Sequence, residues 1–226
     1  PDNLFPVGTT PVTCTVTDAR QQSTSCRFTV VVQPPPPRIL KTNYLAFGDS
    51  MTSGEVTVPL SGVDTAGFPL FRYIVVNTAA YPTQLLAILT ARYTLDAPQI
   101  AVTNAGKGGE WAVDGARRLP EAYVAARPEV VLLFEGANDI ETLGARGIPG
   151  ALAAVDTMTQ YARLGGSEVF VLSMPPARPG GRLTLDSTLI DTYNQQLRSI
   201  ATNRQAIYVD LQTPLAAALT TYIGVD

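Results

Sequence analysis

Three short polar clusters hold the residue types that could carry out covalent chemistry. They read Gly-Asp-Ser in "FGDSMTSGE", Asn-Ala-Gly in "NAGKGG" and Asn-Asp in "EGANDI". A serine hydroxyl at a turn is a candidate nucleophile, and backbone N–H groups and amide side chains are the donors that stabilise an oxyanion. This chemistry is acyl transfer, with Ser50 as nucleophile and the Ser50 N–H, the Gly106 N–H and the Asn138 amide as donors. Asp49 and Asp139 are the supporting neighbours.

Each cluster taken alone also has an ordinary structural interpretation. Gly-Asp-Ser is a common turn that would cap a helix, Gly106 could serve a tight turn, and Asn138 and Asp139 could cap the helix that follows them. Their positions favour the chemical interpretation, because each cluster directly follows a successive strand of the predicted sheet. Strand ends of a parallel sheet meet at one edge, where α/β proteins place their sites.

Five short apolar runs predict the strands that position these clusters. They cover residues 44–48, 100–106, 129–136, 168–174 and 206–211, and each is bounded by Gly, Asn or Pro. Helical patterns separate them at 82–93, 147–163 and 186–203, and Pro120 is expected to start a fresh turn. Alternating strands and helices predict an α/β fold, a three-layer sandwich around a mainly parallel five-stranded sheet.

The composition excludes several classes of function. Nearly half of the 226 residues are hydrophobic, the net charge is -3, and Lys and Arg form no run, so we expect a globular protein without a nucleic-acid partner. No apolar run is long enough for a transmembrane segment, and the first residues do not resemble a signal peptide. With no His and only two Cys we expect no metal site, and no motif calls for a cofactor.

The N-terminal segment differs from the rest of the chain. The stretch "PVTCTVTDARQQSTSCRFTVVV" alternates like two strands, and a hairpin centred on Arg20 would place Cys14 opposite Cys26 and Val12 opposite Phe28. A cross-strand disulfide is then plausible and would indicate an oxidising environment; the alternative is two free thiols.

A proline run marks a boundary behind this hairpin. We expect a partial β module at 1–33, a proline-rich linker at 34–38 and an α/β domain at 39–226. A hairpin of this size is marginal as an independent domain, so the chain is expected to start partway through an Ig-like module.

Two family resemblances agree with this division. The wording "FPVGTTPVTCTVTDARQQSTSCRFTVVV" resembles the last two strands of a hyalin-repeat (HYR) module, an Ig-like repeat of extracellular proteins. The later blocks "FGDSMTSGE", "NAGKGG" and "EGANDI" resemble, in order, the first three blocks of the SGNH hydrolases of the GDSL esterase/lipase family. That resemblance implies a flavodoxin-like α/β/α sandwich, with Ser50 as the nucleophile and Gly106 and Asn138 as oxyanion donors.

The chain departs from that family at its fourth block, Asp-x-x-His, whose histidine is the general base. The sequence contains no histidine and ends in "TTYIGVD", so Asp226 takes the place of the aspartate of the catalytic triad. We expect a chain truncated before this block is complete and nearly inactive as given. The alternative is a non-catalytic extracellular binding or adhesion module.

The resemblance implies a secreted or cell-surface serine esterase that forms an acyl-enzyme. Its substrates would be small-molecule, carbohydrate or lipid esters of short acyl or acetyl groups, and we expect a monomer within a larger multidomain chain. The segment 56–78 directly follows the nucleophile and is expected to set substrate specificity.

Overall fold

The computed structural model describes residues 4–63, 65, 67, 69–177 and 186–219. The chain divides into two compact units, Pro1–Arg38 and Ile39–Asp226. Within the described residues, no helix is both long enough and apolar enough to cross a membrane.

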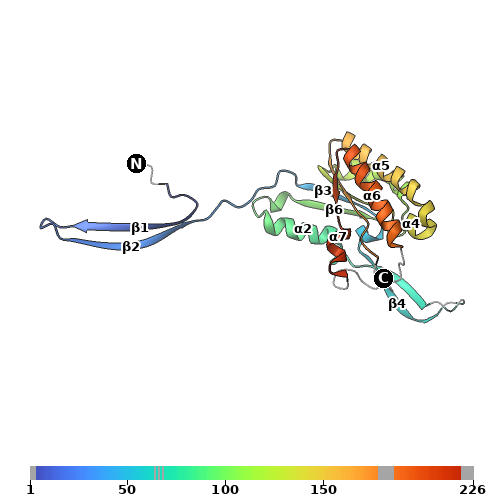
Figure 1. Ribbon diagram of the computed structural model, residues 1–226, viewed down its shortest axis with the longest axis horizontal. Coiled ribbons are helices and arrows are strands. Elements are labelled where there is room, and N and C mark those ends of the chain that lie inside the picture. Colours follow the sequence, from blue (N-terminus) through green and yellow to red (C-terminus); the bar gives the residue numbers. More distant parts are fainter. Residues whose placement is uncertain (1–3, 64, 66, 68, 178–185, 220–226) are drawn as a thin grey trace. The chain divides into compact units, whose positions relative to one another are not determined.

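The first unit contains the predicted antiparallel hairpin, formed by β1 (Gly8–Thr17) and β2 (Ser23–Val32) (Figure 1). Asp18 shapes its turn by accepting hydrogen bonds from the backbone N–H groups of Arg20 and Gln22, both at 2.8 Å. Because most side chains of both strands are exposed, the hairpin buries little apolar surface of its own.

The predicted pairing within this hairpin is confirmed, with Val12 opposite Phe28 and Cys14 opposite Cys26. Both cysteines are nevertheless free and exposed, so the predicted disulfide is not formed in the structure. Register decides which residues face each other, whereas the covalent bond also requires a short sulfur–sulfur distance and an oxidant.

The second unit is built on the predicted five-stranded sheet, and all its neighbouring strands pair in parallel (Figure 1). The strand order is β6-β3-β7-β8-β9. The bounds are Asn43–Gly48 for β3, Ala101–Gly106 for β6, Val130–Phe134 for β7, Glu168–Leu172 for β8 and Ile207–Val209 for β9. Because β3 lies between β6 and β7, the chain crosses from one side of β3 to the other as it passes from β6 to β7. α/β proteins place their sites at such a switch point, beyond the carboxyl ends of the strands.

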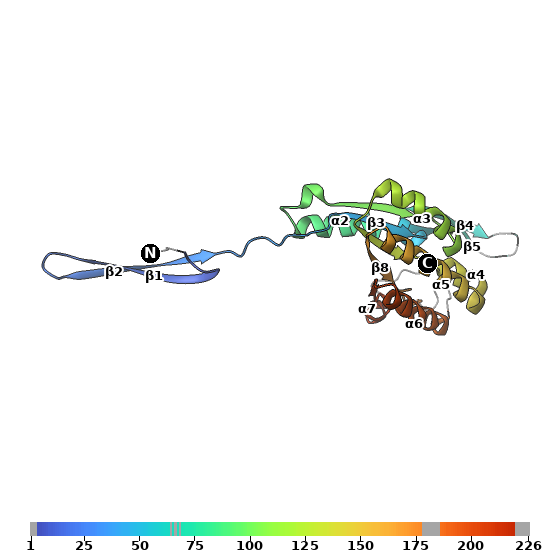
Figure 2. The ribbon, with the colours of Figure 1, turned by 90° about the horizontal axis from the view of Figure 1, so that it is seen from above.

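Helices follow the strands in turn and cover the sheet (Figure 2). They are α1 (Ser50–Ser53), α2 (Tyr81–Arg92), α3 (Ala112–Ala126), α4 (Ala137–Leu143), α5 (Ile148–Leu164), α6 (Ser187–Asn203) and α7 (Gln212–Ala216), with short 3-10 turns η1 (Ala97–Gln99) and η2 (Gly144–Arg146). Helix α5 packs between α3 and α6, whereas α2 packs against β6. The predicted α/β fold is therefore confirmed.

The prediction that Pro120 starts a fresh turn is wrong, because α3 continues through this residue. Proline removes one helical hydrogen bond, but the helix is held on both sides of it. Ala112 and Leu119 are buried in the core before the proline, and Ala122 packs against the same core after it.

One continuous hydrophobic core lies between the sheet and the helices α3, α5 and α6. Its fully buried members come from alternate positions of the central strands and from the inner faces of these helices: Leu45, Phe47, Val131, Leu133, Val169, Val171, Met158, Tyr193 and Leu197. The central strands are consequently held rigidly, and so are the residues at their ends.

The segment after α1 forms a second hairpin, β4 (Glu55–Val63) and β5 (Pro69–Val75), which pair antiparallel. It extends away from the main sheet (Figures 1 and 2). Several large apolar side chains on it are exposed, namely Leu60, Val63, Leu70, Phe71, Tyr73, Ile74 and Val75. An apolar surface of this kind is expected at a binding site rather than on an inert loop.

Candidate active site

Ser50 lies at a sharp turn from strand to helix. Strand β3 ends at Gly48, Asp49 caps the single-turn helix α1 by accepting a hydrogen bond from the Met51 N–H at 2.9 Å, and Ser50 is the first helical residue. The serine is partly exposed, while Asp49 beside it is fully buried. Ser50 therefore stands at the start of a helix, and the N–H groups of the next three residues are bonded to Asp49.

The ends of three strands meet beside this turn. Gly48 pairs with Gly106 of β6 on one side and with Phe134 of β7 on the other. A Cβ on Gly48 would lie only 2.1 Å from the Phe134 carbonyl oxygen, so the strands approach closely here because residue 48 is a glycine. The predicted convergence of the serine, glycine and asparagine clusters on one edge of the sheet is present.

Gly106 packs against the nucleophile's helix. A Cβ at this position would lie 2.1 Å from the Ser53 backbone nitrogen, so only glycine fits between β6 and α1. The Gly106 N–H donates to the Asn104 side-chain oxygen at 2.9 Å. To serve as an oxyanion donor, this N–H must break its hydrogen bond to Asn104 and donate to the substrate oxygen instead. The oxyanion role of Gly106 stays a prediction.

Asn138 lies in the first turn of α4 but does not cap that helix. The helix is capped by Gly136 without a side-chain bond, and the Asn138 amide instead donates to the Glu110 backbone carbonyl at 2.8 Å. An amide nitrogen carries two N–H groups, so the second remains for an oxyanion. The structure thus opposes the capping interpretation, and the oxyanion role of Asn138 stays a prediction.

The supporting aspartates link neighbouring elements. Asp139 accepts a hydrogen bond from the Ala112 N–H at 3.0 Å, so it caps α3, which precedes it in the chain. Burial raises the pKa of Asp139, and the bond from Ala112 opposes this. The pKa of Asp49 is raised to about 7, chiefly by burial and to a smaller extent by the carboxylates of Asp139 and Glu110, although the hydrogen bond from the Met51 N–H lowers it.

A buried acidic pair that the sequence did not reveal lies behind this edge. The Glu110 side chain is 1% exposed and forms an ion pair with Arg118, accepting from its Nε at 2.9 and 3.0 Å and from its Nη2 at 2.5 Å. Glu135, directly after β7, is also buried, and neither of its carboxyl oxygens has a hydrogen-bond partner. In the sequence, Glu110 and Arg118 lie eight residues apart near a helix start, and charged residues in such a position ordinarily indicate a solvated face.

Glu135 is held in its protonated form. Burial, and after it the carboxylates of Asp49 and Glu110, raise its pKa to about 10 against the lowering effect of Arg118. As a neutral acid, Glu135 adds no second negative charge beside the Glu110 carboxylate, so the two acids can share one buried region. Within the described part of the chain, no three His, Cys, Asp or Glu residues are arranged to hold a metal ion.

The β4–β5 hairpin begins beside the loop that follows Gly106. A Cβ on Gly108 would lie 2.0 Å from a carboxylate oxygen of Glu55, the first residue of β4, so Glu55 occupies the space that the glycine leaves. The segment expected to set specificity therefore starts next to the predicted oxyanion loop.

The predicted triad is not complete in this chain. The 226 residues contain no histidine, and Asp226 lies outside the residues that the structure describes. Ser50, Gly106 and Asn138 can consequently be placed, whereas the general base and its orienting carboxylate cannot.

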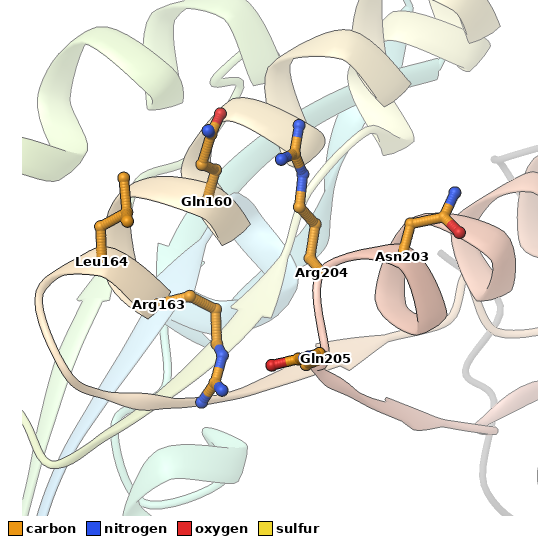
Figure 3. Close-up of a pocket in the computed structure, with 6 residues that line it drawn as sticks. All are labelled: Gln160, Arg163, Leu164, Asn203, Arg204 and Gln205. Carbon is orange, nitrogen blue, oxygen red and sulfur yellow. The ribbon is translucent and has the colours of Figure 1, made fainter.

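A cavity of about 300 Å³ lies elsewhere on the domain (Figure 3). It is lined by Gln160, Arg163, Leu164, Asn203, Arg204 and Gln205, from the carboxyl ends of α5 and α6. These helices end just before β8 and β9 begin, so the cavity is at the amino edge of the parallel sheet. The nucleophile is at the opposite edge, and this cavity does not belong to its site.

Comparison with known proteins agrees with this arrangement. Residues 46–223 match the GDSL-like Lipase/Acylhydrolase family, and residues 1–32 match the HYR domain. No significantly similar sequence was found among curated proteins.

Solved structures with the same fold include several esterases. A variant of Axe2, an acetyl-xylooligosaccharide esterase from Geobacillus, shares 20% identity with a TM-score of 0.60, covering 82% of this chain and 83% of that one. A lipase/acylhydrolase from Enterococcus faecalis shares 25% identity with a TM-score of 0.53, covering 82% of both chains. BT4096, a gut microbial diltiazem-metabolizing enzyme, shares 15% identity with a TM-score of 0.56; the match covers 80% of this chain and 40% of BT4096.

The fold, the serine at the strand-to-helix turn and the convergent glycine and asparagine define an SGNH-type hydrolase domain. The chain belongs to the GDSL-like lipase/acylhydrolase family and carries an N-terminal HYR domain fragment.

Proposed function

We propose that this domain is a serine esterase that hydrolyses short acyl or acetyl esters, including those on carbohydrates, through an acyl-enzyme. The observation that carries the proposal is the alignment of Gly48 with Gly106 at the sheet edge where Ser50 and Asn138 also lie. Family membership supports the ester-hydrolase class. The carbohydrate preference draws on the shared fold with the acetyl-xylooligosaccharide esterase Axe2.

In the proposed reaction, each group has one role. The Ser50 oxygen attacks the ester carbonyl while its proton passes to a histidine base, and the carbonyl oxygen becomes an oxyanion. The Ser50 N–H and the second N–H of Asn138 bind this oxyanion, joined by the Gly106 N–H once Asn104 has released it. The alcohol leaves with the proton from the histidine, and water then releases the acid from the acyl-serine.

The 226 residues contain no histidine, and in this proposal the base belongs to a longer polypeptide. In this proposal Asp226 orients it, as the first residue of an Asp-x-x-His block. Solved structures of Axe2 include catalytic mutants at a serine and at a histidine, and we carry this pair of groups over to the proposal. The 226-residue chain is therefore expected to be less active by several orders of magnitude than a polypeptide that continues through that block.

The test compares p-nitrophenyl acetate hydrolysis by the 226-residue chain and by the longer polypeptide. We expect activity only in the longer polypeptide, and its loss in a Ser50→Ala variant of that polypeptide. Equal activity of the two wild-type chains would contradict the proposed role of the missing block. Xylo-oligosaccharides with and without acetyl groups, compared with p-nitrophenyl esters of longer acids, would then test the substrate class.

A second candidate function rests on the HYR match and the absence of histidine from the sequence. In this alternative the chain is a non-catalytic extracellular binding or adhesion module. It predicts that the longer polypeptide is also inactive and that Ser50 resists labelling by a fluorophosphonate. Under either function we propose a secreted or cell-surface location, supported by the HYR match and the two facing cysteines.

A further inference from the structure

The Asn138 amide is held by a carbonyl whose own residue is tightly anchored. Glu110 lies between β6 and α3, and its backbone carbonyl accepts the Asn138 amide at 2.8 Å. Its carboxylate, buried at the same point of the chain, is bound by Arg118 from the middle of α3 through three contacts of 2.5 to 3.0 Å. The orientation of an oxyanion donor thus depends on a residue that is fixed by an ion pair.

The same arginine also contacts the strand that leads to the nucleophile. The Arg118 guanidinium stacks over the Phe47 ring, 4.1 Å from its centre, and one of its nitrogens approaches the Gly48 carbonyl oxygen at 3.5 Å. Gly48 is separated from Ser50 only by the buried Asp49. One guanidinium therefore connects the end of β3 with the loop after β6.

The negative charge of the buried Glu110 carboxylate is balanced by cations. Both of its oxygens bind the Arg118 guanidinium, and the largely exposed Lys107 ammonium lies 3.4 Å from one of them. Burial raises the pKa of the nearby Glu135, which favours its neutral form beside the Glu110 carboxylate. A buried carboxylate matched by one fork-shaped cation has a well-defined geometry, because the guanidinium binds both of its oxygens at once.

We propose that Glu110 and Arg118 are positioning residues of the oxyanion hole. Their buried ion pair fixes the carbonyl that orients the Asn138 amide and couples it to the strand that presents Ser50. The inference rests on the proposed esterase function, and neither residue touches the substrate. Their effect on the reaction passes through Asn138 and Gly48.

The test replaces Glu110 by Gln in the longer, histidine-containing polypeptide. Glutamine keeps the size of the side chain and its backbone carbonyl but removes the charge that Arg118 binds. We expect kcat for p-nitrophenyl acetate to fall by about 10- to 100-fold, with KM changed less than about threefold. The reason is that an oxyanion donor stabilises the transition state and not the bound substrate, so its displacement lowers kcat. The inhibition constant of a short alkylboronic acid, whose serine adduct places an oxygen in the oxyanion hole, should rise by a similar factor.

A double variant, Glu110→Gln with Arg118→Met, separates positioning from stability. Removing both partners of a buried ion pair often leaves stability unchanged or improved, whereas removing one leaves a buried charge unmatched. We expect the double variant to melt near the wild-type temperature and to retain the loss of kcat. A purely structural role would instead restore kcat along with the melting temperature.

Asp156→Asn provides a matched control. Asp156 also binds an arginine through two hydrogen bonds, from Arg204 at 2.7 and 2.6 Å, at the opposite edge of the sheet beside the cavity of Figure 3. Its kcat should stay within about twofold of wild type. An active wild type with unchanged kcat in the Glu110→Gln and double variants would overturn this inference alone. An inactive wild type would overturn the proposed function and this inference with it.

Discussion

Substituting Gly106 by alanine should displace the helix that carries the nucleophile. The added Cβ would lie 2.1 Å from the Ser53 nitrogen and 2.6 Å from the Ser53 Cα. Real Cβ atoms do not approach heavy atoms closer than 3.0 Å, so the gap is short by about 0.9 Å, the difference between 2.1 and 3.0 Å. Both contacts are with backbone, which has no side-chain rotation to relieve them, so β6 and α1 must separate.

Two measurable effects follow from this separation. Overpacking at a tight contact destabilises a protein by about 1–3 kcal/mol, and we expect a loss of this size. Ser50 begins the same single-turn helix, so its oxygen moves as well. A misplacement of about 1 Å can reduce the rate by about 100-fold, and we expect such a fall in kcat.

The stability arm needs no histidine and can use the 226-residue chain. Urea unfolding followed by the fluorescence of Trp111, the one tryptophan of the sequence, reports on the α/β unit. The matched control is Gly150→Ala in α5, where an added Cβ meets nothing within 4 Å and helix propensity favours alanine by about 1 kcal/mol. If Gly106→Ala were as stable as this control and equally active when extended, the close approach of β6 and α1 would not govern the site.

Three further predictions concern the acidic region, a glycine and the N-terminal hairpin. The pKa of Glu135 is raised from 4.5 to about 10, so between these pH values the folded state binds a proton that the unfolded state has lost. The free energy of unfolding should therefore fall as pH rises from 4.5 to about 10. In thermal melts between about pH 6 and 9, Glu135→Gln should flatten this slope. Gly136→Ala should cost about 1–3 kcal/mol in urea unfolding, because φ is +109° and a Cβ would lie 2.4 Å from the Tyr193 hydroxyl; wild-type stability would contradict this. Oxidised glutathione should join Cys14 to Cys26 within one chain, seen as the loss of two hydrogen atoms by mass spectrometry, whereas a glutathione adduct on each thiol would refute the predicted bond.

Local patterns were sufficient to predict the strands and the residues at their ends. Short apolar runs bounded by Gly and Asn indicated all five strands of the sheet, and the hairpin register followed from alternation around Arg20. They were not sufficient for Pro120, because packing of α3 against the core outweighs the local cost of proline. Local patterns also did not predict strands in residues 56–78, where β4 and β5 pair as an antiparallel hairpin.

The amino-acid sequence by itself determined that the three polar clusters lie along one edge of the sheet, because parallel strands end at the same edge. The position of β3 between β6 and β7, which makes them neighbours, came from the structure. Only the tertiary structure decided what holds them. The bond from Asn138 to the Glu110 carbonyl joins residues 28 positions apart, and Arg118 reaches Gly48 across 70 positions. Such pairings depend on which buried groups of distant segments face each other, and that is established only when the sheet and helices pack.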